Sequence, residues 1–79
     1  MSIETILKSL ETIFQETLEN PTIRLRLETT ANDIAEWDSV THLVLLHSIE
    51  QELNVRFTLD EIMQFQNVGD ICQSILSRT

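Results

Sequence analysis

Ser39 and His42 stand three positions apart near the middle of the chain. On a helix this spacing would bring a hydroxyl and an imidazole onto one face, as a nucleophile and its general base require. Hydrolysis would also need an orienting group, an oxyanion site and a pocket. A chain this small has little room for the cleft of ~300 Å³ at which small-molecule sites begin. We therefore expect no catalytic residue and a protein that is not an enzyme.

Metal binding finds equally little support among the polar residues. His47 follows His42 by five positions, so on a helix the two imidazoles point about 140° apart and cannot share one ion. Cys72 is the only cysteine and most resembles a small hydrophobic residue. The acidic residues at positions 33–38 do not follow the alternating oxygen ligands of a calcium loop. The sequence predicts no metal site.

Ser39 also stands where an irregular segment, 19–37, meets an apolar run, 40–53. Asp38 and Ser39 are both residues that cap a helix, because their oxygens accept from the unpaired N–H groups of the first turn. Ser39 is then structural. Alternatively, Ser39 carries a covalently attached, phosphate-linked arm, which the positive end of the helix dipole would favour. These residues alone leave both interpretations open.

Composition limits the class of protein. The 79 residues suffice for one small domain, 1–79, and the net charge of -8 disfavours nucleic acid and anionic membranes as partners. The lone cysteine suits a reducing compartment, and neither a signal peptide nor a membrane span is visible. We expect a cytoplasmic, monomeric protein whose partners are other proteins.

One glycine, one proline and 42% hydrophobic residues favour an all-α fold. Apolar residues at intervals of three and four predict a first helix over 3–18, with Ser2 as its cap, that ends before Asn20-Pro21. The second helix should cover 40–53 and end at Asn54, a residue suited to the left-handed conformation.

Two further helices complete the predicted bundle. Thr58 begins a capping box, followed by a short helix whose buried side consists of Ile62, Met63 and Phe65. Asn67 should cap the last helix, which continues toward the C-terminus.

The segment before the second helix shows a different pattern. Ile23, Leu25 and Leu27 alternate with arginines, which we interpret as a long connection whose apolar side chains insert into the bundle. Trp37 ends this segment. It either packs the loop against the helix start, as a hydrophobic staple, or contacts a partner protein.

The order of these elements resembles the acyl carrier protein family over essentially the whole chain. The resemblance includes Asp38-Ser39-Val40 at the start of the second helix, Ile49 to Leu53 at its end, and Asn67-Val68-Gly69-Asp70-Ile71 at the start of the last. It implies an acyl-carrier-like four-helix bundle with three longer helices, one short third helix, and a long loop between the first two.

The resemblance also implies the function. Ser39 would carry 4′-phosphopantetheine, attached by a holo-carrier synthase (a phosphopantetheinyl transferase), and the arm would hold acyl groups as thioesters for acyl-loading and acyl-transfer enzymes. Such a carrier serves fatty acid, polyketide or related biosynthesis. The partner face would comprise Asp38, Thr41, Val44, His47 and Gln51 together with Trp37. The interior that receives an acyl chain would comprise Leu43, Leu46, Ile49, Ile62, Val68 and Cys72.

Two departures from the family pattern refine this expectation. Trp37 stands where carriers of bacterial fatty acid synthesis usually have glycine, and Thr41, Val44 and His47 replace acidic residues of the second helix. We therefore expect a specialised carrier and not the housekeeping one. The alternatives are a peptidyl or aminoacyl carrier, or a helical interaction module that never carries an arm.

Overall fold

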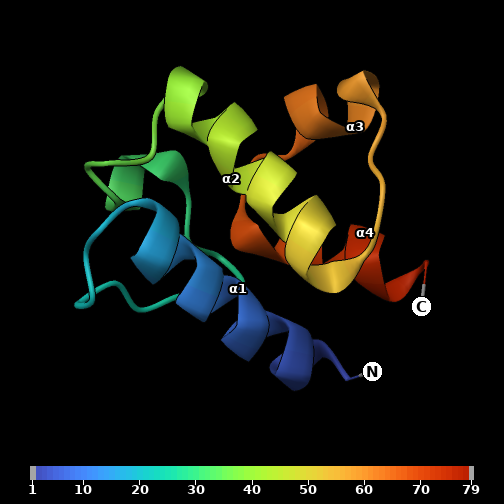
Figure 1. The fold of residues 1–79 in the computed structure, drawn as a ribbon, viewed down its shortest axis with the longest axis horizontal. Coiled ribbons are helices and arrows are strands. Elements are labelled where there is room, and N and C mark those ends of the chain that lie inside the picture. The colour runs from blue at the N-terminus through green and yellow to red at the C-terminus, as the bar shows by residue number, and fades with distance from the viewer. Residues whose placement is uncertain (1, 79) are drawn as a thin grey trace.

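The computed structural model describes residues 2–78. Within this range the chain forms α1 (Ile3–Thr17), the short 3₁₀ helix η1 (Ala31–Asp33), α2 (Ser39–Leu53), α3 (Leu59–Gln64) and α4 (Val68–Leu76), and it contains no strand. Both α2 and α4 pack against α1, while α3 lies near α2 (Figure 1). The expected all-α bundle with three longer helices and a short third one is confirmed.

Side-chain caps fix where these helices begin and end. Ser2 accepts from the Thr5 N–H at the start of α1, and Asn67 accepts from the Asp70 N–H at the start of α4. Thr58 and Glu61 form a complete capping box at α3. Asn54 ends α2 in the left-handed conformation, with φ of 55°. The caps predicted at Ser2, Asn54, Thr58 and Asn67 are therefore confirmed.

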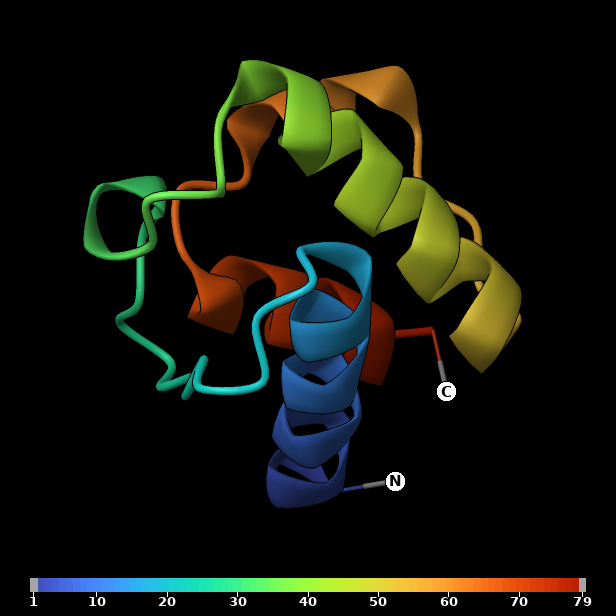
Figure 2. The same cartoon turned by 60° about the vertical axis from the view of Figure 1, so that its left-hand side comes forward.

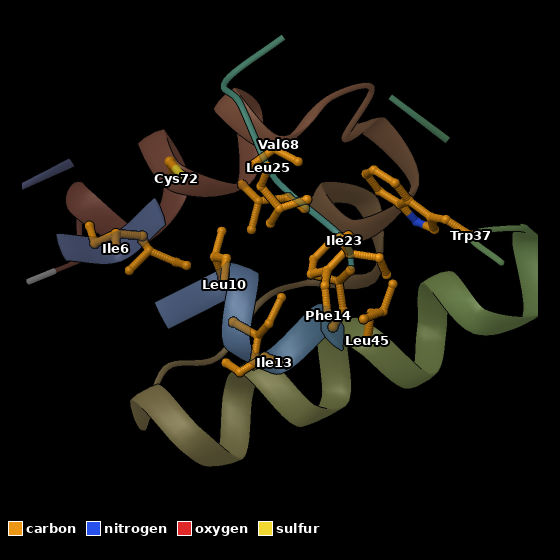
Figure 3. Close-up of a cluster of buried hydrophobic side chains, with 14 of the residues drawn as sticks. Ile6, Leu10, Ile13, Phe14, Ile23, Leu25, Trp37, Leu45, Val68 and Cys72 are labelled. Carbon is orange, nitrogen blue, oxygen red and sulfur yellow. The ribbon is translucent and has the colours of Figure 1, made fainter. Parts of the chain in front are cut away.

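A single hydrophobic cluster joins the three longer helices (Figure 3). Its fully buried members from the helices are Ile6, Leu10, Phe14, Leu45, Leu46, Ile49, Val68, Ile71, Cys72 and Ile75. The loop contributes Ile23, Leu25, Ile34 and Trp37. The long connection is thus part of the core, and its geometry is tied to that of the helices it joins.

The connection between α1 and α2 runs along one side of the bundle before α2 begins (Figure 2). Ile23 and Leu25 are buried as expected, but Leu27 is 39% exposed, so the prediction that it inserts into the bundle is wrong. At Leu27 the loop contacts α4 through its backbone. The Leu27 carbonyl accepts from the Gly69 N–H at 2.7 Å, which leaves the side chain facing solvent.

Helix α3 has no buried residue. Ile62 and Phe65 are half-buried, whereas Met63 is 72% exposed, contrary to the buried position expected for it. A helix of six residues offers one narrow face to the core, and Met63 lies off that face. None of the helices in residues 2–78 combines the length and apolar character needed to cross a membrane.

Candidate functional site

Ser39 is the first residue of α2, and Asp38 is the cap. One carboxylate oxygen of Asp38 accepts from the backbone N–H groups of Val40 and Thr41, each at 2.9 Å. The interpretation of Ser39 as a capping residue is therefore wrong. Asp38 precedes the first turn and reaches its free N–H groups, whereas the Ser39 side chain starts inside the helix.

Thr41 completes the helix start from the other side. Its hydroxyl accepts from the Asp38 N–H at 2.8 Å and donates to the Glu36 carbonyl at 2.7 Å. The hydrogen bond from the Thr41 N–H lowers the pKa of Asp38 most strongly. Desolvation opposes it, and the Val40 N–H and the Thr41 hydroxyl lower the pKa further. The carboxylate is thus ionised and committed to the helix, without any help from Ser39.

The Ser39 side chain is exposed, and its Oγ makes no hydrogen bond within residues 2–78. It lies at the positive end of the α2 dipole, where a phosphate ester is electrostatically favoured. A phosphate-linked arm attached here would displace no protein contact. These local features fit such a group.

An open groove of about 430 Å³ begins directly beside Ser39. Its lining is mostly apolar and comes from the loop, the first turns of α2, and the α3 region: Ala31, Trp37, Asp38, Ser39, His42, Leu43, Met63, Phe65 and Gln66. The expectation that the bundle has no room for a small-molecule cleft is wrong, because the loop and α3 stand apart over α2. Binding sites for small molecules commonly begin at ~300 Å³.

His42 connects the walls of this groove and does not face Ser39. Its Nδ1 accepts from the Trp37 indole Nε1–H at 3.0 Å, and its Nε2–H donates to the Ile62 carbonyl at 2.8 Å. Both ring nitrogens are engaged, so this imidazole is not placed to activate the Ser39 hydroxyl. His42 is half-buried and acts as a structural link between the loop and the α3 region.

Trp37 is only 5% exposed, so the assignment of its side chain to the partner face is wrong. Its ring meets Phe14 of α1 edge to face, with centroids 5.0 Å apart, and lies at the margin of the hydrophobic cluster (Figure 3). An indole removes a large apolar area from water when it packs this way. Trp37 thus fastens the end of the loop to α1. The staple interpretation placed its contact at the start of the second helix, where the indole does stack on the His42 ring.

The six residues expected to line an acyl interior do not form one cavity. Leu46, Ile49, Val68 and Cys72 are fully buried in the packed core. Leu43 is 50% exposed and lines the groove, so its placement in the interior is wrong. Leu46, almost one turn further along α2, is covered by the core, whereas Leu43 is left open on the groove side. The groove instead uses residues that no local pattern marked, such as Ala31 and Gln66.

The remaining partner-face residues lie along α2. Asp38, Val44, His47 and Gln51 are exposed, and Thr41 is half-buried because its hydroxyl serves the cap. Val40 is 71% exposed and Val44 is 50% exposed, which leaves an apolar strip next to Ser39. Within residues 2–78, no three His, Cys, Asp or Glu side chains are grouped closely enough to hold a metal ion.

A helical bundle with an unengaged serine hydroxyl at a helix start is the arrangement expected of a carrier domain. Residues 8–75 match the family described as "Phosphopantetheine attachment site", and the chain belongs to this family. It is also similar to the solution structure of holo acyl carrier protein from Geobacter metallireducens, with 37% identity over 91% of this chain and 86% of that chain, and a TM-score of 0.83. No curated protein sequence matches.

The chain is accordingly a non-catalytic carrier that a phosphopantetheinyl transferase modifies with covalent 4′-phosphopantetheine. The expectations on fold, cofactor and absence of enzymatic activity are confirmed by this membership.

Proposed function

We propose that Ser39 is the attachment residue and that the arm carries acyl intermediates of a dedicated biosynthetic pathway. One comparison among the serines supports this residue. Ser2, Ser39 and Ser77 are the exposed serines of residues 2–78, but the Ser2 hydroxyl bonds Thr5 and the Ser77 hydroxyl donates to the Ser74 carbonyl. The Ser39 hydroxyl alone among them is free to be esterified.

The chain contributes electrostatics and shape to the attachment. The start of α2 offers its dipole to the phosphodiester, while Asp38 keeps its carboxylate turned to the Val40 and Thr41 N–H groups. The bound group supplies a terminal thiol, which holds the cargo as a thioester. Ser39 itself lines the groove, so cargo returning along the arm would meet Leu43, Met63 and Phe65.

The groove favours an alkyl or polyketide acyl group over an aminoacyl group. Its one ionised lining residue is Asp38, whose Oδ1 already accepts two backbone N–H groups, and the other lining side chains are apolar or neutral. Each methylene that leaves water gains roughly 0.8 kcal/mol. An ammonium group would lose part of its hydration here, with the Asp38 carboxylate as the one charged partner in the lining. A peptidyl or aminoacyl carrier remains the second candidate, supported only by family membership.

The partner enzymes would dock on α2 beside Ser39. The face formed by Asp38, Thr41, Val44, His47 and Gln51 carries a single acid, and Val40 and Leu43 extend it with exposed apolar surface. Apolar anchors contribute most of the affinity of an interface, whereas rim charges mainly steer association. This composition supports a specialised carrier that recognises a few dedicated enzymes.

Mass spectrometry tests the attachment directly. Wild-type protein, Ser39→Ala and Ser77→Ala are incubated with coenzyme A and a broad-specificity phosphopantetheinyl transferase. We expect the wild type and Ser77→Ala to gain the mass of one phosphopantetheine group and Ser39→Ala to gain nothing at unchanged helicity. Modification of Ser39→Ala would refute the residue, and an unmodified wild type would favour the interaction module without an arm.

Loading the modified wild-type protein with different acyl groups tests the cargo. The thermal midpoint should rise when the octanoyl group is loaded onto the arm, because the groove covers the chain, and should not rise with a glycyl group. A rise with the glycyl group alone would support the aminoacyl alternative.

A further inference from the structure

Among the side chains of residues 2–78, His42 alone hydrogen-bonds both the loop and the α3 region across the groove. It belongs to the second turn of α2, accepts from the Trp37 indole on the loop side, and donates to the Ile62 carbonyl on the α3 side. The Trp37 and His42 rings lie nearly parallel, at 23°, with centroids 5.9 Å apart. Trp37, His42 and the flanking Phe65 all line the groove.

Both partners of His42 need this contact. The Trp37 side chain is almost fully buried, and an indole N–H in that position requires an acceptor. Ile62 is in the last turn of α3, where helical carbonyls lack partners within the helix. The Phe65 N–H donates to Glu61 and the Gln66 N–H to Asp70, so neither reaches Ile62.

The two contacts also fix the state of the imidazole. Trp37 Nε1 can only donate and the Ile62 carbonyl can only accept, so Nδ1 is the bare nitrogen and Nε2 carries the hydrogen. No other tautomer or charge state of His42 makes both hydrogen bonds. The link is therefore directional: it needs an acceptor toward Trp37 and a donor toward Ile62.

The hydrogen bond from His42 matters because few contacts hold α3 in the bundle. None of its residues is fully buried. Glu61 ties it to α4 and the C-terminal segment through Ser74 and Arg78, Ile62 and Phe65 pack against the margin of the core, and the Phe65 ring meets Phe57 edge to face at 5.4 Å. The groove side has the His42 bond to Ile62. Of these contacts, only the His42 link connects α3 to the loop side of the groove through Trp37.

We propose that His42 is a positioning residue that sets the width of the groove and thereby the length of acyl chain that the carrier shelters. This inference rests on the proposed function. With His42 in place, α3 stays close to Trp37 and the groove covers a chain of limited length. Without it, α3 moves away from the loop, shorter chains lose their cover, and longer chains fit.

The test compares wild type, His42→Leu and the control Gln73→Leu, which adds the same side chain at an exposed position of α4 outside the groove. Each is loaded from coenzyme A thioesters with acyl groups from butanoyl to palmitoyl. The readout is the rate at which hydroxylamine cleaves each thioester, with Trp37 fluorescence as a second probe of the groove.

In wild type and Gln73→Leu, protection should rise with chain length to a maximum. In His42→Leu the protection of the best-sheltered chain should fall about fivefold, as expected when one hydrogen bond leaves an opening equilibrium, and the maximum should shift to longer chains. Identical profiles in all three proteins would overturn the proposal. A wild-type profile that does not depend on chain length would overturn it while leaving attachment at Ser39 intact, whereas failure of loading would refute the attachment itself.

Two measurements keep the test valid if His42→Leu does not fold. His42→Gln retains an acceptor and a donor on one side chain and should recover part of the protection. In the unaltered holo protein, long-range ¹⁵N–¹H spectra should show His42 with hydrogen on Nε2 and a Trp37 indole proton that exchanges slowly with water. Hydrogen on Nδ1, or rapid exchange of the indole proton, would overturn the proposal.

Discussion

The backbone N–H of Gly69 donates to the carbonyl of Leu27 at 2.7 Å, which joins the first turn of α4 to the loop that leads toward Ser39. The neighbouring Val68 N–H donates to the Thr29 carbonyl at 2.9 Å. Two N–H groups that the start of a helix leaves unpaired are thus satisfied by another segment of the chain. The single glycine of the sequence allows this approach, because a Cβ at position 69 would lie 2.9 Å from the Leu27 carbonyl oxygen.

We predict that Gly69→Ala destabilises the protein by about 1–2 kcal/mol, since an added methyl group that forces packed backbone apart costs about 1–3 kcal/mol and the better helix propensity of alanine recovers up to ~1 kcal/mol. Denaturant unfolding measures the change. Gln73→Ala, at an exposed position of the same helix, is the control and should be nearly neutral. A Gly69→Ala protein as stable as wild type would show that the loop and α4 are not coupled here.

The start of α2 gives a prediction that separates structural from functional residues. Asp38→Ala should cost about 1 kcal/mol of stability because it removes the cap, whereas Ser39→Ala should leave stability unchanged within ~0.5 kcal/mol. Modification should show the opposite pattern: the transferase should still modify Asp38→Ala but should not modify Ser39→Ala. Thermal unfolding and intact mass together decide the point. A marked loss of stability in Ser39→Ala would restore the capping role to that residue.

Much of this fold follows from short-range patterns. Ser2, Thr58 and Asn67 cap helices because their side chains reach the backbone a few residues ahead, which sequence spacing encodes directly. The left-handed Asn54 and the apolar stripe of α1 are local in the same sense.

The groove is formed by segments that are distant in the sequence, so local sequence patterns do not predict it. His42 meets Trp37 and Ile62, which lie five residues before it and twenty residues after it, and the second contact depends on where α3 rests. No periodicity reports that placement. The predictions that Leu43 and Met63 are covered are wrong for the same reason, because a sequence pattern identifies apolar residues but not which of them a neighbouring helix leaves exposed.

The ion pair between Arg78 and Glu61 predicts a specific dependence on pH. The Arg78 hydrogen bond and then the Thr58 N–H lower the pKa of Glu61 from 4.5 to about 2. A carboxylate whose pKa is lowered by folding stabilises the native state above its unfolded value and loses that contribution as pH falls. The stability difference between wild type and Arg78→Gln should therefore be complete at neutral pH, shrink between pH 4.5 and 2, and disappear below it.

Arg56→Gln provides the control for this comparison, because it removes the same charge from an exposed arginine. Its difference from wild type should stay small and lack the decline between pH 4.5 and 2. Arg78 also covers the Phe57 ring, with its guanidinium carbon 5.3 Å from the ring centroid. A stability difference between wild type and Arg78→Gln that persists in acid would therefore be assigned to this packing. A difference independent of pH throughout would show that the ion pair does not form in solution.

The last prediction concerns the partner face. Val44 is 50% exposed on α2 and belongs to the apolar surface beside Ser39, so Val44→Asp should slow modification by the transferase about tenfold, equivalent to ~1.4 kcal/mol. Helicity and thermal midpoint should remain close to wild type, since exposed substitutions usually change stability by less than ~0.5 kcal/mol. Gln73→Asp introduces the same charge on α4 and should be modified at the wild-type rate. If Val44→Asp unfolds the protein, Val44 supports the core; if both variants are modified equally fast, the transferase reaches Ser39 without using this face.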